Sequence, residues 1–307
     1  MLQFFLFKVA SILIPRVPVS FSYAVSWCAA EVAYRVARKP REAVQDNLRH
    51  ILGSDANPRT LARAVRGVFH TAAYNYVDMF LIPHIRPEAL AQRVTVHHSE
   101  IFFDAIAAGK GTVLTTAHLG NVDLLVQLSA AMHVPVTVVV ERVAPEALFQ
   151  LVTSLRSSHG VRLLPAGTKA MRELLQRLGK GEAVGVVADR NVLRRGVTVP
   201  FFGENALLPT GAVELAMHHG AVLVPGFGLR LPDRRYQITF EPPIMLEHEG
   251  PKEEVLARNV GRLAAVMERH IREHPEQWVV FAPVWPQSGP RPLPSEAMER
   301  NAIGSRR

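Results

Sequence analysis

The sequence is poor in the features that mark several large classes of protein. Its 307 residues include a single cysteine, Cys28. Neither a disulfide framework nor a cysteine-based metal site is therefore available, and a reducing compartment fits best. Charged residues make up 20% of the chain and hydrophobic residues 48%, which excludes an intrinsically disordered protein. No Gly-x-Ser-x-Gly sequence occurs, so the nucleophile turn of a serine hydrolase is also lacking.

Long apolar runs are lacking as well, even near the start of the chain. Residues 2–14 are largely apolar, but Pro15 and Pro18 interrupt them before a second stretch, residues 19–37, that carries polar and charged side chains. Neither stretch supplies the roughly 20 uninterrupted apolar residues that a bilayer-spanning helix needs. No basic segment precedes the first run and no small-residue cleavage site follows it, so we do not expect a secretory signal peptide.

Two interpretations of this apolar start are open. It can be an amphipathic anchor that lies in the plane of a membrane, with apolar side chains in lipid, namely Phe4, Phe5, Phe7 and Leu13. It can equally be a first helix that is buried in the protein.

The charge balance favours acidic partners. The formal net charge is +8, and most of the cations are arginines. Such a surface attracts anionic lipid, nucleic acid or acidic small molecules. Nucleic acid is disfavoured, because the arginines are spread along the chain and no binding motif or basic, aromatic-interleaved platform occurs. Anionic membrane lipids are the partner that we expect.

The hydrophobic periodicity predicts an α/β fold. Residues 41–53 and 58–82 read as helices, which makes the first third mostly helical. From residue 111 onward, short β-rich runs follow, several of them separated by helical stretches: GTVLTTA, VTVVVE, VRLLP, AVGVVAD, AVLVPGFGL and YQITFEP. Residues 251–274 form a further helix whose charge order suits the helix dipole. We predict a central mixed, largely parallel sheet flanked by helices, after a helical N-terminal region.

The first candidate for chemistry follows the run that begins at residue 111. His118 and Asp123 form an H-x4-D motif across a Gly-Asn turn between a strand and a helix. A carboxylate folded back onto the imidazole would fix its tautomer and raise its basicity, so that the histidine could deprotonate an alcohol. The alternative is a histidine at a strand end and an aspartate that bonds to backbone amides at a helix start.

A second β-rich run ends in a similar way. Asp189 and Arg190 stand at the end of the β-rich run within residues 184–191, and strand ends of α/β sheets are where sites form. Two strand ends could thus present a histidine, two carboxylates and a guanidinium to one pocket. A structural Asp-Arg pair is the alternative.

Several motifs together resemble a known family. They are HLGNVD, VVERVAPEALF, ADRN with RRGVTVPFFG and LPTGAVELAMHHGAVLVP, and a late HPEQW. Taken in this order, from Asn47 to Trp285, the sequence resembles the lysophospholipid-acyltransferase-like superfamily. Within it, the branch of lipid A late acyltransferases and phosphatidylinositol mannoside acyltransferases is the most similar. The resemblance implies an acyltransferase domain over residues 41–286. From its composition, the segment 1–40 is expected to be a membrane-associating helical region, and the Pro-rich, polar tail over 287–307 is expected to be mobile.

The resemblance implies direct transfer of a fatty acyl group from a CoA or acyl-carrier-protein thioester to a lipid hydroxyl, without a cofactor. It makes His118 the general base and Asp123 the acid of the motif. Asp189 stands where the mannoside branch carries a glutamate that partners the histidine, so which acid contacts His118 stays open. Two histidine pairs, residues 97–98 and 218–219, lack the spacing of ligands, and no metal site is predicted.

The same resemblance suggests residues for substrate binding. Glu141 and Arg142 match an acid-basic pair after the second strand, and Arg156 matches a basic residue on the next helix. With Arg190, these groups are candidates for contacts with an acceptor headgroup or donor phosphates, since arginine binds phosphate bidentately. Surface ion pairs are the alternative. Asn121, or a backbone amide beside it, is the candidate oxyanion donor.

The end of the sequence guides the choice of substrate. Residues 278–285, and an aspartate instead of a glutamate at position 123, resemble the phosphatidylinositol mannoside acyltransferases more than the lipid A enzymes. We therefore expect a glycolipid or phospholipid acceptor, acyl-CoA as donor, and a peripheral position on the cytoplasmic face of a bacterial inner membrane. The alternatives are a lipid A enzyme that uses acyl carrier protein and a catalytically degenerate lipid-binding protein.

Overall fold

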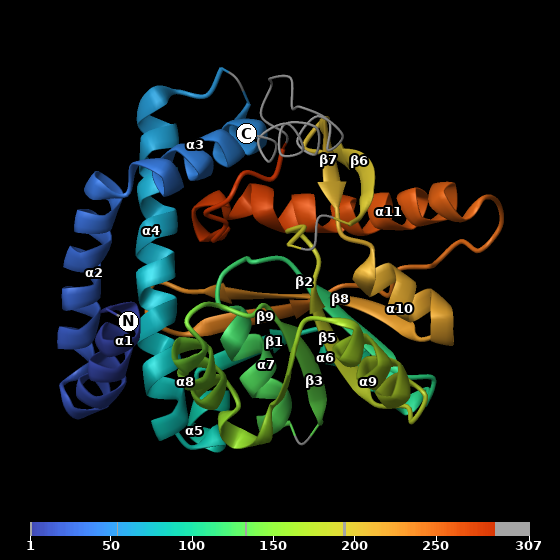
Figure 1. Ribbon diagram of the computed structural model, residues 1–307, viewed down its shortest axis with the longest axis horizontal. Coiled ribbons are helices and arrows are strands. Elements are labelled where there is room, and N and C mark those ends of the chain that lie inside the picture. Colours follow the sequence, from blue (N-terminus) through green and yellow to red (C-terminus); the bar gives the residue numbers. More distant parts are fainter. Residues whose placement is uncertain (1, 54, 133, 193–194, 286–307) are drawn as a thin grey trace, which may run out of the picture.

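The computed structural model describes residues 2–53, 55–132, 134–192 and 195–285, so the tail predicted to be mobile, 287–307, lies outside it. The first third is helical, as predicted. Its helices are α1 (Leu2–Leu13), α2 (Val19–Val36), α3 (Arg38–Leu52) and α4 (Pro58–Leu81). The prolines act as expected, because α1 ends before Pro15 and α2 begins directly after Pro18. Figure 1 shows α1 and α2 on the outer side of the long helix α4.

A seven-stranded sheet forms the centre of the molecule, in the order β1-β9-β8-β2-β5-β3-β4. Its strands are β1 (Val94–His97), β2 (Thr112–Thr116), β3 (Val136–Val140), β4 (Arg162–Pro165), β5 (Ala183–Val187), β8 (Val222–Arg230) and β9 (Tyr236–Phe240). Neighbouring strands pair in parallel except β8 and β9, which are antiparallel. The predicted mixed, largely parallel sheet is confirmed, and every β-rich run named above is a strand.

Helices cover both faces of the sheet. Successive strand residues point to opposite sides, and here the residues on both sides are apolar and pack against helices. In β2, Val113 belongs to the core shared with α9 (Thr168–Leu178), α10 (Gly211–His219) and α11 (Lys252–Glu273). Its neighbour Leu114 packs on the other face, against α6 (Ser99–Ala107) and α7 (Val122–Ala131). Two short helices complete this side, α5 (Pro87–Ala91) and α8 (Glu146–Arg156). The doubly covered sheet explains why its strands read as continuous apolar runs.

The structure contains a hairpin and a short edge strand that the sequence analysis did not predict. The strands β6 (Val197–Phe201) and β7 (Glu204–Leu208) form an antiparallel pair that packs on α11. The signal was present, since Val197, Val199 and Phe201 alternate with exposed residues and point inward. The Phe201-Phe202 step is buried, as expected of core aromatics. Strand β1 has four residues and lies at the sheet edge, where its pattern is too short to read.

Ion pairs and hydrogen bonds around the buried carboxylate of Glu31 join α2 to α4. The Glu31 carboxylate, whose side chain is 6% exposed, accepts hydrogen bonds from Arg66, from Arg35 at 2.8 Å and from His70 at 2.7 Å. The hydrogen bond from Arg66, together with the other partners, lowers the pKa of Glu31 to about 2. These polar contacts hold the inner face of α2, while its outer face remains open.

The outer faces of α1 and α2 expose large apolar side chains. These are Phe5, Leu6, Val9, Ile12 and Leu13 on α1, and Val19, Phe21, Val25, Trp27, Val32 and Val36 on α2. None of the side chains described in α1 is buried, so the interpretation as a buried first helix is wrong. Phe7 departs from the anchor interpretation, because its ring packs edge-on against Tyr76 and Phe80 of α4. No helix within the described ranges combines the length and apolar character needed to cross a bilayer.

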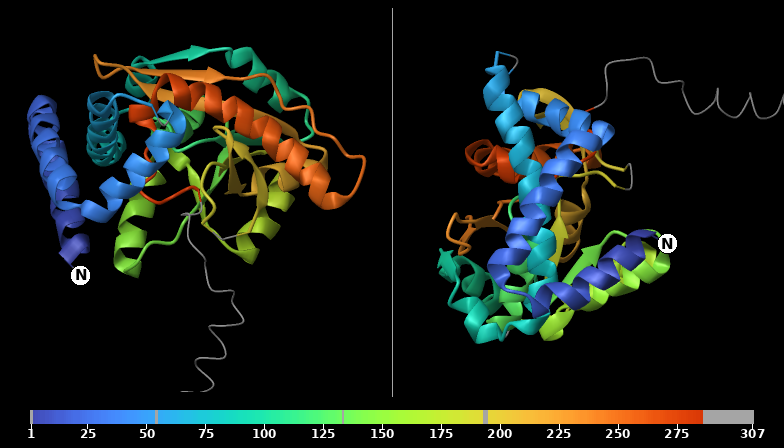
Figure 2. Two further views of the ribbon diagram at one scale, coloured as in Figure 1. Left: turned by 90° about the horizontal axis from the view of Figure 1, so that it is seen from above. Right: turned by 90° about the vertical axis from the view of Figure 1, so that its left-hand side faces the viewer.

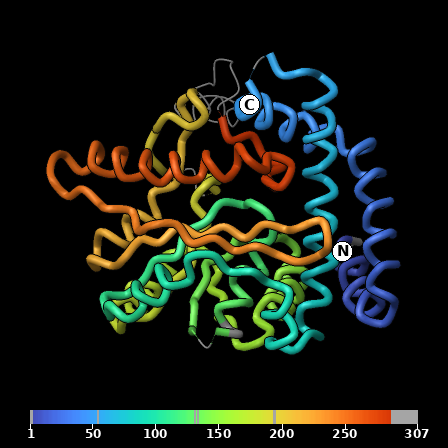
Figure 3. The backbone as a smooth tube through the Cα atoms, turned by 180° about the vertical axis from the view of Figure 1, so that it is seen from behind, coloured from blue at the N-terminus to red at the C-terminus, as the bar shows by residue number. Residues whose placement is uncertain are grey.

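The position of α1 brings the apolar N-terminus against α8. Figure 2 shows α1 running alongside α8, and the two helices are in contact. Seen from behind, α1, α2 and α4 stack at one side of the sheet (Figure 3). The helices that carry the exposed apolar residues are therefore attached to the rest of the molecule through α4 and α8.

Candidate active site

The candidate site lies where neighbouring central strands end. Strand β2 ends at Thr116 and is paired in parallel with β5, with Thr116 opposite Val187. The same register places His118, two residues beyond β2, level with Asp189, two residues beyond β5. Because carboxyl ends of parallel strands share one edge of a sheet, the side chains meet there.

His118 and Asp189 form a directly hydrogen-bonded pair. Nδ1 of His118 lies 2.8 Å from Oδ1 of Asp189, and the backbone N–H of His118 donates to Oδ2 at 2.8 Å. Trp278 adds a third bond, since its Nε1–H donates to Oδ2 at 2.6 Å. The Asp189 side chain is fully buried, whereas 35% of the His118 side chain is exposed. The bond at Nδ1 leaves Nε2 as the ring nitrogen for a substrate.

The electrostatics of the pair favour a basic histidine. Burial disfavours the charged imidazolium, but the charge and hydrogen bond of Asp189 outweigh it and raise the pKa of His118 above its usual 6.5. Arg190 and Arg156 oppose this rise. Burial would raise the pKa of Asp189, yet the imidazolium and the donated hydrogen bonds keep it low. A histidine held in this way can take a proton from a hydroxyl group.

Asp123 has a different partner. Its Oδ1 lies 2.9 Å from Nε of Arg156, at the end of α8, and this ion pair joins the start of α7 to α8. The H-x4-D spacing therefore brings Asp123 near the site without placing it on the imidazole. The question of which acid bonds His118 is answered by the geometry in favour of Asp189.

The remaining charged candidates follow the ends of strands β3 and β5. Arg190 pairs with Glu141 at 3.1 Å, which links the residue after Asp189 to the end of β3. Arg142 pairs with Glu146 at 3.6 Å and has a largely exposed side chain. Both arginines follow strand ends, and their side chains are 62% and 37% exposed for Arg142 and Arg190, so solvent reaches both guanidinium groups.

Asn121 faces the interior. Its side chain is 1% exposed; Nδ2 donates to Asp78 at 2.8 Å, and Oδ1 accepts from the N–H of Leu124 at 3.1 Å, which caps α7. The Asp78 carboxylate also accepts bonds from Tyr236, at 2.7 Å, and from Arg230. These contacts fasten the turn after His118 to α4, and the predicted oxyanion role of Asn121 stays a prediction.

Trp278 and Asp78 are site residues that sequence reasoning did not assign. The HPEQW motif contains Trp278 and was visible, but its spacing gave no partner. Asp78 lies inside a helical pattern, and its only sequence signal is a charge on a face that is otherwise apolar.

Gly120 permits the tight turn between His118 and α7. Its φ is +61°, and an added Cβ would collide with the carbonyl oxygen of Gly228 on β8. Gly120→Ala is expected to lower the free energy of unfolding by about 2–4 kcal/mol, because left-handed strain and a backbone clash add. Gly220 has the same φ of +61° and nothing within 4 Å, so Gly220→Ala should cost only about 1 kcal/mol. Equal losses in denaturant unfolding would contradict the close contact.

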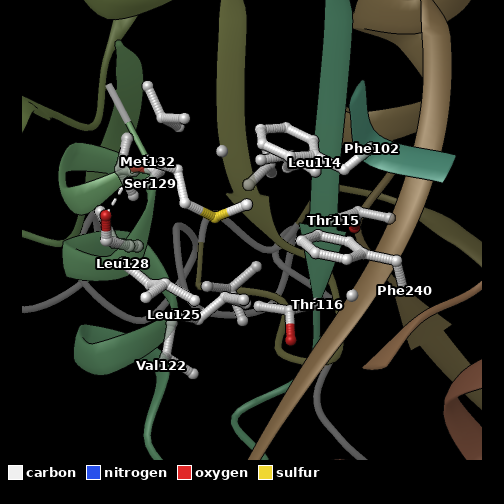
Figure 4. Close-up of a pocket in the computed structure, with 17 residues that line it drawn as sticks. Phe102, Leu114, Thr115, Thr116, Val122, Leu125, Leu128, Ser129, Met132 and Phe240 are labelled. Carbon is white, nitrogen blue, oxygen red and sulfur yellow. Dashed lines mark hydrogen bonds between the residues drawn. The ribbon is translucent and has the colours of Figure 1, made fainter. Parts of the chain in front are cut away.

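An apolar cavity begins beside this turn and runs between α7 and the sheet. Figure 4 shows Thr116 and Val122 at one end, Leu125 and Ser129 along α7, and Met132 reaching across. Its free volume is about 40 Å³, and because one water needs about 10–15 Å³, only a few small groups fit without movement of the walls. Met132 is a flexible side chain that can make room. The described residues contain no group of three or more histidine, cysteine or acidic residues arranged to hold a metal ion.

Comparisons with known proteins identify the class of protein to which this sheet and its strand-end His-Asp pair belong. The sequence profile of the bacterial lipid A biosynthesis acyltransferases matches residues 1–287. The chain belongs to this family. It is 28% identical over 257 residues to the phosphatidylinositol mannoside acyltransferase of Mycolicibacterium smegmatis, covering 80% of this chain and 79% of the relative. The enzyme of the same name from Mycobacterium tuberculosis H37Rv is 30% identical over 213 residues, 68% of this chain and 66% of the relative. The chain is thus an O-acyltransferase of lipid biosynthesis.

Proposed function

We propose that this acyltransferase moves a fatty acyl group from acyl-CoA to a hydroxyl group of a glycolipid or phospholipid, with His118 as general base. The observation that carries the proposal is the position of the His118–Asp189 pair, two residues beyond Thr116 and Val187, which line an apolar cavity, and next in sequence to the partly exposed Arg190. A base, an apolar slot and cationic groups are what a thioester with a long acyl chain and phosphates requires.

The reaction follows from the free nitrogen of His118. Nε2 takes the proton of the acceptor hydroxyl as its oxygen attacks the thioester carbonyl. The new C–O bond forms, the C–S bond breaks, and the departing thiolate takes up the proton, which regenerates the neutral imidazole. Asp189 stabilises the imidazolium that forms in between. Because a thioester is already activated, positioning supplies most of the acceleration.

The arginines fit the donor and the acceptor headgroup. Arg142 and Arg190 lie at the strand-end edge and can each bind phosphate oxygens with two N–H groups. Glu141 and Asp123 orient Arg190 and Arg156 through their ion pairs. We assign these four groups and Arg142 to substrate positioning.

The transfer assay with a labelled donor tests the proposal. Radiolabelled palmitoyl-CoA is incubated with bacterial lipid extract and either the wild-type chain or His118→Ala, and mass spectrometry identifies the acylated lipid. We expect a glycolipid or phospholipid product from wild type. The mannoside relatives favour this acceptor, whereas the family profile keeps lipid A with palmitoyl-acyl carrier protein as the alternative. Lipid binding without transfer from either donor would leave a degenerate lipid-binding protein.

The cavity predicts a dependence on acyl-chain length. Ser129 lies two helical turns from the end of the cavity at Thr116 and Val122, so Ser129→Phe should block a palmitoyl chain and leave a butyryl chain unaffected. Each methylene that can no longer be buried forfeits about 0.8 kcal/mol. We expect kcat/KM for palmitoyl-CoA to fall at least 10-fold relative to butyryl-CoA, and an unchanged ratio would place the acyl chain elsewhere.

We further propose that the protein lies on the cytoplasmic face of the bacterial inner membrane as a peripheral protein, with the outer faces of α1 and α2 in the lipid. The exposed apolar side chains of these two helices support this, and so does the excess of arginine over acidic residues. Aromatic residues such as Phe5, Phe21 and Trp27, which are about half exposed, are suited to the headgroup boundary.

Vesicle binding tests this placement. Binding should strengthen with anionic lipid and weaken with salt, because the charge contribution is screened. Phe5→Ser with Phe21→Ser should weaken binding at least about 100-fold, since each phenylalanine is worth about 1.5–3 kcal/mol in an apolar medium. Phe103→Ser is the matched control, an exposed phenylalanine on α6. Salt-independent binding would leave the arginines without a role, and an equal loss in the control would exclude α1 and α2.

A further inference from the structure

We propose that Trp278 is a positioning residue for acyl transfer, which holds the Asp189 carboxylate in the orientation that serves His118. The inference rests on the proposed role of His118 as base. It gives a function to the HPEQW motif near the end of the described chain.

The hydrogen bonds of Asp189 show why an additional donor matters. Oδ1 has one partner, Nδ1 of His118, while Oδ2 has two, the backbone N–H of His118 and Nε1–H of Trp278 at 2.6 Å. The carboxylate is fully buried, so water does not replace a lost partner. Two of these three hydrogen bonds come from His118 itself. The third comes from the Trp278 indole, which follows the short helical turn Pro275–Gln277.

Trp278 is itself held firmly against the catalytic turn. Its neighbours pair with the turn through backbone bonds: the C=O of Gln277 accepts from Gly120 at 2.8 Å, and the N–H of Val279 donates to His118 at 2.8 Å. The indole ring is 1% exposed. The donor and the histidine therefore move as one unit, which is the arrangement expected of a group that orients a catalytic pair.

The chemistry of an indole suits this place. An N–H donor stabilises a buried carboxylate without adding a positive charge that would compete with the imidazolium. An arginine at the same position would neutralise Asp189 and lower the basicity of His118. The hydrogen bond from Trp278 contributes to the low pKa of Asp189, so the carboxylate stays ionised although it is buried.

The test compares two tryptophans of the same aromatic cluster. Trp285 is 4% exposed, and its Nε1–H donates to the carbonyl of Phe201 at 3.2 Å, not to a carboxylate. Trp278→Phe removes the donor and keeps a ring. We expect kcat for palmitoyl transfer to fall about 10- to 100-fold, the range seen when a supporting hydrogen bond of a site is lost, with KM for palmitoyl-CoA unchanged. Trp285→Phe should change kcat less than about 2-fold, and equal losses in kcat would overturn the proposal.

A double variant separates positioning from general packing. If Trp278 acts through Asp189, then Asp189→Asn combined with Trp278→Phe should be no slower than Asp189→Asn alone. Losses that multiply would show that the tryptophan acts by another route and would overturn the proposal.

A measurement on the wild-type chain covers the case in which Trp278→Phe does not fold. The NMR resonance of the Trp278 Nε1–H should follow the titration of His118, because both groups share one carboxylate. A Trp278 resonance that does not respond overturns the proposal. If wild type transfers no acyl group while this resonance does respond, the proposed function fails and the hydrogen-bonded unit stands.

Discussion

Asp189→Asn is expected to lower kcat for acyl transfer by about 10³-fold, with a range of 10²–10⁴. The carboxylate accepts three hydrogen bonds, two from His118 and one from Trp278. An asparagine offers a single acceptor oxygen and two N–H donors. No rotation of the amide satisfies all three donors, so the imidazole loses both its tautomer control and the charge that stabilises the imidazolium. The rates come from initial-velocity measurements with saturating palmitoyl-CoA.

Asp123→Asn is the matched control for this prediction. It makes the same chemical change in the acid of the H-x4-D motif, which pairs with Arg156 and not with His118. We expect kcat to fall by no more than about 10-fold, with an effect on KM because Arg156 loses its orienting partner. If Asp123→Asn were the slower variant, the acid that serves His118 during turnover would be Asp123, and the pairing with Asp189 would be structural.

His118→Ala is expected to reduce kcat by about 10²–10⁴-fold, the usual contribution of a positioned general base. KM for the donor should change little, since the arginines and the apolar cavity remain. Added imidazole should restore part of the rate, because 35% of the His118 side chain is open to solvent. His248→Ala, at an exposed histidine outside the site, should behave as wild type. Full activity of His118→Ala would remove this residue from the mechanism while leaving family membership intact.

The positions of His118 and Asp189 could be predicted from the sequence because each follows a recognisable strand. The runs that end before His118 and Asp189 are easy to recognise because both are buried on two faces and rich in β-branched residues. Their adjacency follows from the parallel register of β2 and β5, which no local pattern contains. Periodicity therefore locates the two strand ends that carry candidate residues. The pairing of β2 with β5 then shows that these residues form a single site.

The local spacing of the motif was a weaker guide. In H-x4-D the aspartate is near in sequence, yet α7 begins at Val122, and the helix directs Asp123 toward Arg156 on α8. Asp189 reaches the imidazole from 71 positions further along the chain. A contact of that kind depends on tertiary packing, and the sequence could name both acids without choosing between them.

The N-terminus illustrates a different limit. The composition of α1 and α2 fits both a lipid-facing and a buried helix, because apolar side chains are equally compatible with lipid and with a protein interior. The structure distinguishes them through what lies opposite: Phe7 packs against Tyr76 on α4, whereas Phe5 and Leu6 are more than half exposed. Helix orientation depends on a partner surface that is built from distant residues, so it could not be read locally.

The pH dependence of kcat, measured for wild type and for Asp189→Asn, tests the central claim most directly. The neutral imidazole is the active base, so the rate should rise with pH through the His118 pKa, and Asp189 raises that pKa above 6.5. In Asp189→Asn the midpoint should move to lower pH and the plateau should fall, because the carboxylate charge is lost. A midpoint that stays in place in Asp189→Asn but moves in Asp123→Asn, or a rate without an acidic limb, would contradict a His118–Asp189 base.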